Sequence, residues 1–118
     1  MDRTKFMEAM KQQKDRVDRD MVKEFLYKQQ KNRPNETPFG WYGMLNSAEE
    51  MMEFGKEMIK YIRGKGDRND FVQELADAYL SMEYAKHAAG ITDEEFFRAI
   101  NVKLQYTLDG YSPDGVRQ

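Results

Sequence analysis

The chain has 118 residues, enough for one helical domain with a modest core or for a larger core shared between copies. Forty per cent of the residues are apolar, which argues against disorder, yet no apolar run approaches the roughly 20 residues that cross a bilayer. The net charge is −2, and the lack of cysteine excludes disulfides and thiolate metal sites. We therefore predict a soluble, single-domain protein of the cytoplasm with no membrane partner.

Charge is distributed unevenly along the chain. Residues 1–33 hold ten basic and six acidic side chains, whereas residues 34–118 hold nine basic and fifteen acidic ones. A general nucleic-acid binder needs a basic surface that displaces counterions from phosphates. The acidic main part therefore disfavours nucleic acid as a partner and leaves room for a cation site.

A long amphipathic helix is predicted over residues 1–30. Apolar side chains recur there every three or four positions, which is the spacing of one helix face: Met7, Met10, Val17, Met21 and Phe25. Residues 31–46 hold prolines, glycines and clustered aromatic residues, and we predict an ordered connecting loop. Residues 109–118 have little apolar content and are predicted to form a mobile tail.

Three further helices are predicted in the core, residues 47–108. Apolar periodicity places them at about 47–62, 67–89 and 92–108. Thr92 followed by Glu95 has the spacing of a capping box at the start of the last helix. The expected fold class is all-α: a four-helix-type bundle with a long N-terminal helix, assembled as a homodimer or a dimer of dimers.

Two acidic motifs have the spacing of one helix face. Glu50 and Glu53 are three residues apart in one predicted helix, as are Glu74 and Asp77 in the next. If the two helices are antiparallel neighbours, four carboxylates converge and repel one another unless a cation compensates them. Oxygen ligands suit magnesium, whereas zinc favours imidazole and thiolate ligands, which are scarce here. The motifs therefore indicate a Mg²⁺ site, with Mn²⁺ as an alternative ion.

Together these motifs resemble those of the MazG-like all-alpha nucleotide pyrophosphohydrolases, a family that includes dimeric dUTPases and is related to phosphoribosyl-ATP pyrophosphohydrolase. The family pattern is EExxE followed by ExxD. Glu49-Glu50-x-x-Glu53 matches the first part and Glu74-x-x-Asp77 matches the second, with twenty residues between them.

The likeness covers roughly residues 41–108, and it implies an enzyme that hydrolyses a nucleoside triphosphate to the monophosphate and pyrophosphate in a house-cleaning role. It gives Glu49 and Glu50 a catalytic role, in which Glu49 supports the site or helps to orient the attacking water. The resemblance implies four magnesium ligands: Glu50, Glu53, Glu74 and Asp77.

One departure from the family concerns the phosphates. Family members often carry further basic or amide side chains in and after the last helix, where this chain offers Lys103. Lys65 and Lys103 are therefore the candidate substrate ligands, with Arg68 and Arg117 as substitutes. Trp41 is a candidate for stacking on the nucleobase, and the competing interpretation is that it packs the loop onto the bundle.

Structural explanations compete with the catalytic one. Ser47 and Glu50 have the spacing of a capping box at the start of a helix, which would account for Glu50 without any metal. On a helical wheel Glu50 and Glu53 also lie away from the apolar stripe, as in a solvated face. The alternative function is therefore a non-catalytic helical adaptor or protein-binding module with a vestigial acidic site.

Overall fold

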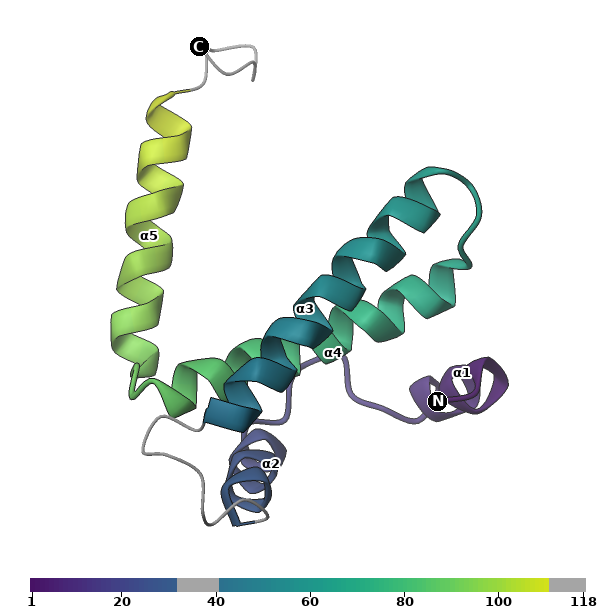
Figure 1. The fold of residues 1–118 in the computed structure, drawn as a ribbon, viewed down its shortest axis with the longest axis horizontal. Coiled ribbons are helices and arrows are strands. Elements are labelled where there is room, and N and C mark those ends of the chain that lie inside the picture. Colours follow the sequence, from purple (N-terminus) through teal and green to yellow (C-terminus); the bar gives the residue numbers. More distant parts are fainter. Residues whose placement is uncertain (32–40, 111–118) are drawn as a thin grey trace.

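The computed structural model describes residues 1–31 and 41–110, and this part of the chain is all-helical (Figure 1). None of its helices combines the length and the apolar character needed to cross a bilayer. The all-α prediction is thus confirmed for the described residues, which contain no strand. The helices are α1 (Arg3–Met10), α2 (Arg19–Lys31), α3 (Trp41–Ile62), α4 (Arg68–Ala88) and α5 (Asp93–Asp109).

The centre of the fold is a hairpin of α3 and α4, which lie side by side in Figure 1. The connecting turn contains Gly64 at φ +73°, a backbone conformation in which a side chain would be strained. α4 starts as predicted after Asp67, whose carboxylate accepts the Asn69 N–H at 2.8 Å and so caps the helix. Three aromatic rings pack between the helices with centroids 5.0–5.7 Å apart: Phe54, Tyr61 and Phe71.

The prediction of one long helix over residues 1–30 is wrong, because residues 11–18 separate α1 from α2. Asp18 provides the physical reason. Its Oδ1 accepts the backbone N–H groups of Asp20 and Met21 at 3.1 and 3.2 Å, which satisfies amides at the start of a new helix. The apolar spacing continues on both sides of the break, so periodicity alone does not reveal it.

α3 begins earlier than predicted. Residues 41–46, expected as the end of the 31–46 loop, form its first turns, while residues 32–40 lie outside the described residues. Ser47 is therefore inside the helix, where it is only 5% exposed. A side chain in that position does not cap the helix start, so the capping-box explanation of Glu50 is wrong.

The boundary between α4 and α5 agrees with the prediction. Gly90 has φ +72°, and the Thr92 hydroxyl accepts the Glu95 N–H at 3.2 Å as the N-cap of α5. α5 then extends away from the hairpin and packs along neither α3 nor α4 (Figure 1). A closed four-helix bundle is therefore not formed by the described part of one chain. The predicted mobile tail lies largely in residues 111–118, outside the described residues.

A buried ionic network joins α2, α4 and the start of α5. Glu83 and Lys86 are 5% and 8% exposed, and the Lys86 Nζ lies 3.2 Å from Oε2 of Glu83. Lys86 also donates a hydrogen bond to Asp93, and Arg19 lies 3.4 Å from Glu83. Burial alone would raise the pKa of Glu83, but hydrogen bonds from Tyr79, Lys86 and Arg19 hold it below its ordinary value. The network therefore fixes the first turn of α5 against α2 and α4.

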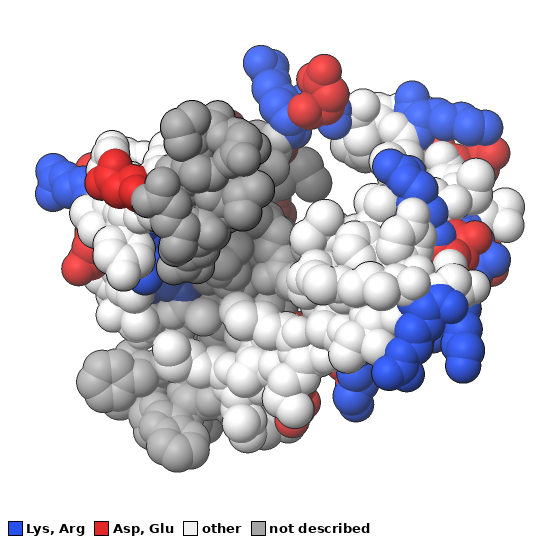
Figure 2. All heavy atoms as spheres, turned by 90° about the horizontal axis from the view of Figure 1, so that it is seen from above, with Lys and Arg blue, Asp and Glu red and all other residues white. Residues whose placement is uncertain are grey.

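The core of a single chain is small. Among the described residues only Val22 and Tyr84 are buried apolar side chains, and none is fully buried. The radius of gyration is 17.2 Å, compared with about 13.5 Å for a compact domain of this length. On the face in Figure 2 charged side chains of both signs lie mostly towards the edge, and the described atoms near the centre are mostly uncharged. One copy of the chain thus leaves much apolar surface open.

Candidate metal centre

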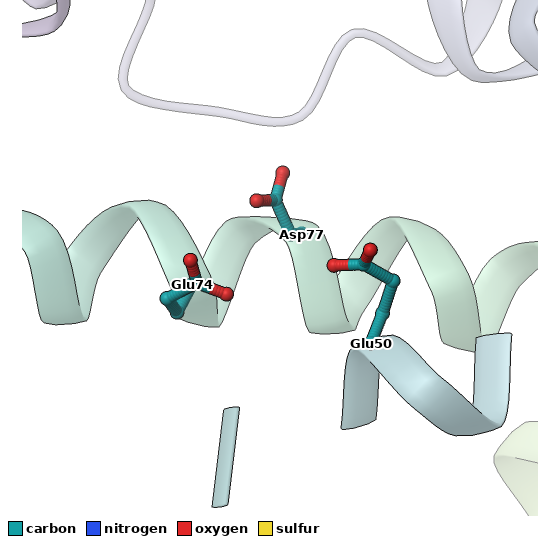
Figure 3. Close-up of side chains that lie close together, drawn as sticks. All are labelled: Glu50, Glu74 and Asp77. Atoms are coloured by element: carbon teal, nitrogen blue, oxygen red, sulfur yellow. The ribbon is translucent and has the colours of Figure 1, made fainter. Parts of the chain in front are cut away.

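Three acidic side chains from the two predicted motifs meet on the α3–α4 hairpin. Glu50 comes from α3, and Glu74 and Asp77 lie one turn apart on α4 (Figure 3). Each offers one carboxylate oxygen, and these three oxygens lie within 4.8 Å of one another. The hairpin thus brings together two motifs that are separate in the sequence.

The charges of this cluster have no paired cation among the described side chains. No lysine or arginine of residues 1–29 or 44–110 forms an ion pair with Glu50, Glu74 or Asp77. The nearest lysines along α3, Lys56 and Lys60, pair instead with acidic residues one turn before them on the same helix.

Glu74 shows the electrostatic consequence. Burial raises the pKa of its carboxyl above the ordinary value, and the negative charges of Asp77 and Glu50 raise it further. Carboxylates in this arrangement repel one another and are stabilised by a bound divalent cation. The donor set consists of oxygen atoms only, so it fits a hard ion such as Mg²⁺ or Mn²⁺ better than zinc.

The other acidic residues of the first motif lie outside this group of three. Glu53 is exposed and pairs with Lys56 at 3.4 Å. Glu49 is also exposed, on a different side of α3 from Glu50. Both residues lie within one helical turn of Glu50. The predicted catalytic role of Glu49 and the predicted metal-binding role of Glu53 stay predictions.

Sequence reasoning missed Glu57. Its side chain is 16% exposed, it lies two turns after Glu50 on the α3 face towards α4, and its charge helps to raise the pKa of Glu74. Lys60 lies 3.5 Å from its carboxylate. The signal was present in the sequence, because residues seven apart in a helix share a face.

The predicted substrate-binding residues do not gather at the acidic cluster. Lys65 lies in the turn at the tip of the hairpin, about 18 Å of helix beyond Glu50. Lys103 is on α5, where its Nζ lies 5.9 Å from the Tyr106 ring centre. The side chain of Trp41 and the position of Arg117 lie outside the description.

A small pocket opens beside Glu50, between α2, α3 and α4. Its volume is about 140 Å³, and its lining combines side-chain amides, hydroxyl groups and aromatic rings. Gln29 supplies one amide from α2, and Asn46 supplies the other from α3. The pocket therefore offers hydrogen-bonding groups and ring contacts next to a cluster of carboxylates.

Comparison with known proteins assigns neither a family nor a function to this chain. No family model, no curated protein and no solved structure matches the chain. The features of the chain that bear on its function are therefore the two acidic motifs and the meeting of their carboxylates.

Proposed function

We propose that this protein is a magnesium-dependent nucleoside triphosphate pyrophosphohydrolase of the MazG-like type, which releases the nucleoside monophosphate and pyrophosphate in a cytoplasmic house-cleaning role. The observation that supports the proposal most strongly is the approach of Glu50, Glu74 and Asp77 to within 4.8 Å. Each of these residues belongs to the EExxE or ExxD motif that suggested the function.

In this proposal Glu50, Glu74 and Asp77 hold the metal ion. A bound magnesium ion would neutralise charge on the phosphate oxygens, which is its general contribution to phosphoryl chemistry. Glu53 stays the predicted fourth ligand, Glu49 supports the site or helps to orient the attacking water from α3, and Glu57 adds negative charge near Glu74. The nucleotide is the substrate, and the active form is a homodimer or a dimer of dimers.

The pocket beside Glu50 is the proposed position of the nucleobase ring. Its volume of about 140 Å³ is close to the roughly 150 Å³ that accommodates a benzene ring in an engineered cavity. Amides such as those of Gln29 and Asn46 both donate and accept hydrogen bonds, as the edge of a nucleobase requires. Asn46→Ala should therefore raise KM more than it lowers kcat.

Incubation of the purified protein with a panel of nucleoside triphosphates and Mg²⁺ tests the activity. Pyrophosphate and the monophosphate should appear together, and their absence with every nucleotide would count against the proposal. Asp77→Asn should abolish turnover, because it removes a carboxylate of the cluster. Glu53→Gln should have a smaller effect, since Glu53 lies outside the three-oxygen group, and Glu94→Gln on α5 is the matched control.

A non-catalytic binding module remains the second candidate, and one observation favours it. Neither of the two predicted phosphate ligands, Lys65 and Lys103, lies at the acidic cluster. This candidate predicts no nucleotide hydrolysis and no dependence of any activity on Asp77. The nucleotide panel therefore separates the two candidates.

A further inference from the structure

The face of α3 opposite to α4 carries an uncovered apolar stripe, here called the α3 seam. Its residues recur at alternating intervals of three and four, which is the heptad spacing of helices that pair. In Figure 1 α3 lies in front of α4, and no other described helix covers its near side. The large side chains of the seam are 51–75% exposed. The seam consists of Leu45, Ala48, Met52, Gly55, Ile59 and Ile62.

Within the described residues, no contact or backbone conformation requires a glycine at position 55. Gly55 lies inside a 22-residue helix, its φ is not positive, and a Cβ atom added to it would meet nothing within 4 Å. A glycine inside a helix is less favourable than an alanine. A residue without a side chain is expected where a second helix approaches closely, because the side chains at the contact set the distance between two helices.

The seam is complementary to itself when a second α3 runs in the opposite direction. An antiparallel alignment centred between Met52 and Gly55 sets these two residues opposite each other. It also sets Ile59 opposite Ala48, so each large side chain near the centre faces a small one. A parallel alignment would set Gly55 against Gly55 and Ile59 against Ile59. The order of residue sizes therefore favours the antiparallel pair.

The residues beside the seam favour the same direction. Glu49 and Lys56 occupy equivalent heptad positions on one side, and in an antiparallel pair Glu49 of each copy lies beside Lys56 of the other. Two such ion pairs form because the arrangement has two-fold symmetry. The opposite side is apolar, with Met51 and Met58 at 40% and 37% exposure.

The surface area of one copy exceeds that of a compact monomer. The accessible surface is 9712 Å², compared with about 6700 Å² expected for a folded monomer of 14.0 kDa. Obligate homodimers bury about 2000–5000 Å² in total over the two copies. The excess of about 3000 Å² per copy is therefore more than enough to supply an interface of that size, which would remove part of it.

We propose that two copies of this chain pair through the α3 seam, antiparallel and related by a two-fold axis, with Gly55 at the close contact. The pairing specifies an interface, and it holds whether or not the protein hydrolyses nucleotides. It also leaves the metal centre accessible, because Glu50, Phe54 and Glu57 lie on the opposite face of α3, towards α4.

Sedimentation equilibrium of the full chain tests the interface. The wild type should have at least twice the monomer mass of 14.0 kDa, and Gly55→Leu should weaken self-association by at least tenfold. A Cβ atom at this position meets no atom of the described residues within 4 Å, so circular dichroism should show undiminished helicity. Lys60→Leu is the matched control, since it adds the same side chain to α3 outside the seam and should leave the mass unchanged.

Two results would overturn the proposal. One is a wild type that sediments at 14.0 kDa at every concentration. The other is a Gly55→Leu variant that associates as the wild type does, which would move the interface elsewhere, for example to the apolar groove of about 1030 Å³ between residues 13–25 and α4. An assembly larger than a dimer should lose mass in the same variant.

Introduced cysteines test the direction, because the chain has none of its own. Ala48→Cys with Ile59→Cys should give a disulfide-linked dimer under mild oxidation, since residues 48 and 59 face each other across the antiparallel pair. Ile59→Cys alone should give none, because its two copies are about 16 Å apart along the axis. Efficient linkage by Ile59→Cys alone would show a parallel pair and contradict the proposal.

Discussion

Glu50 on α3 and Asp77 on α4 bring carboxylate oxygens within 4.8 Å of each other, with no lysine or arginine of the described residues paired to either. Two negative charges at this distance raise the free energy of the folded state unless a cation lies between them. The relationship therefore predicts how the stability of the fold responds to metal ions, substitutions and pH.

Magnesium should raise the melting temperature of the wild type. A ligand that binds only the folded state stabilises it by about 2.7 kcal/mol when its concentration is 100 times the Kd. Asp77→Asn should remove most of this effect, because it replaces one of the three carboxylates with a neutral amide. Differential scanning calorimetry with MgCl₂, against NaCl of equal ionic strength, measures the shift. An equal shift with both salts would indicate a solvated acidic face.

Without metal, Glu74 should make the protein less stable as pH rises. Because its pKa is raised in the folded state, the folded protein binds a proton there more tightly than the unfolded chain does. Stability is thus lost as pH rises from the ordinary carboxyl pKa through the raised folded value. Glu74→Gln should therefore have the higher melting temperature above that window in EDTA, and the difference should shrink in acid. A less stable Glu74→Gln at neutral pH would contradict this explanation.

Lys86→Met should destabilise the fold by about 3 kcal/mol, because it leaves the buried Glu83 carboxylate without its closest cation. Arg19 and Tyr79 still contact Glu83, which places the expected loss at the lower end of the range for broken buried pairs. Urea unfolding measures the loss. Adding Glu83→Gln should recover part of it, and a double variant no better than Lys86→Met alone would refute a charge-based cause.

Asp67→Ala should cost about 1 kcal/mol, because it removes the side-chain oxygen that caps α4. Asp67→Asn should cost much less, since asparagine is an equally good capping residue. Both variants lose the negative charge that pairs with Arg3 at 3.4 Å. This loss should change the stability little, because the ion pair is about half exposed to solvent. Thermal unfolding of the two variants side by side measures the difference, and equal losses would assign the effect to the ion pair.

The helix boundaries that the sequence predicted correctly have local causes. Asp67 and Thr92 cap α4 and α5 through N–H groups two or three residues away, and Gly64 and Gly90 end helices through their own φ angles. Such interactions depend on neighbouring residues, so they can be identified without knowledge of the fold. The break before Asp18 is also local, but continuous apolar spacing concealed it.

The start of α3 could not be predicted in the same way. Residues 41–46 contain a glycine and follow two prolines, which favours a loop locally, yet they are helical, and Ser47 is buried in the structure. Burial against other elements supplies free energy that local preferences do not include. The error therefore lies where packing outweighs local preference.

The sequence by itself determined which residues can carry the chemistry. The three-residue spacing of Glu50 with Glu53 and of Glu74 with Asp77 follows from helix geometry alone. Only the tertiary structure decided which of them meet. The rotation of α3 against α4 brings Glu50, Glu74 and Asp77 together, leaves Glu53 outside this group and sets the charge of Glu57 near enough to raise the pKa of Glu74. Spacing fixes positions along one helix, whereas the packing of two helices fixes which of those positions face each other.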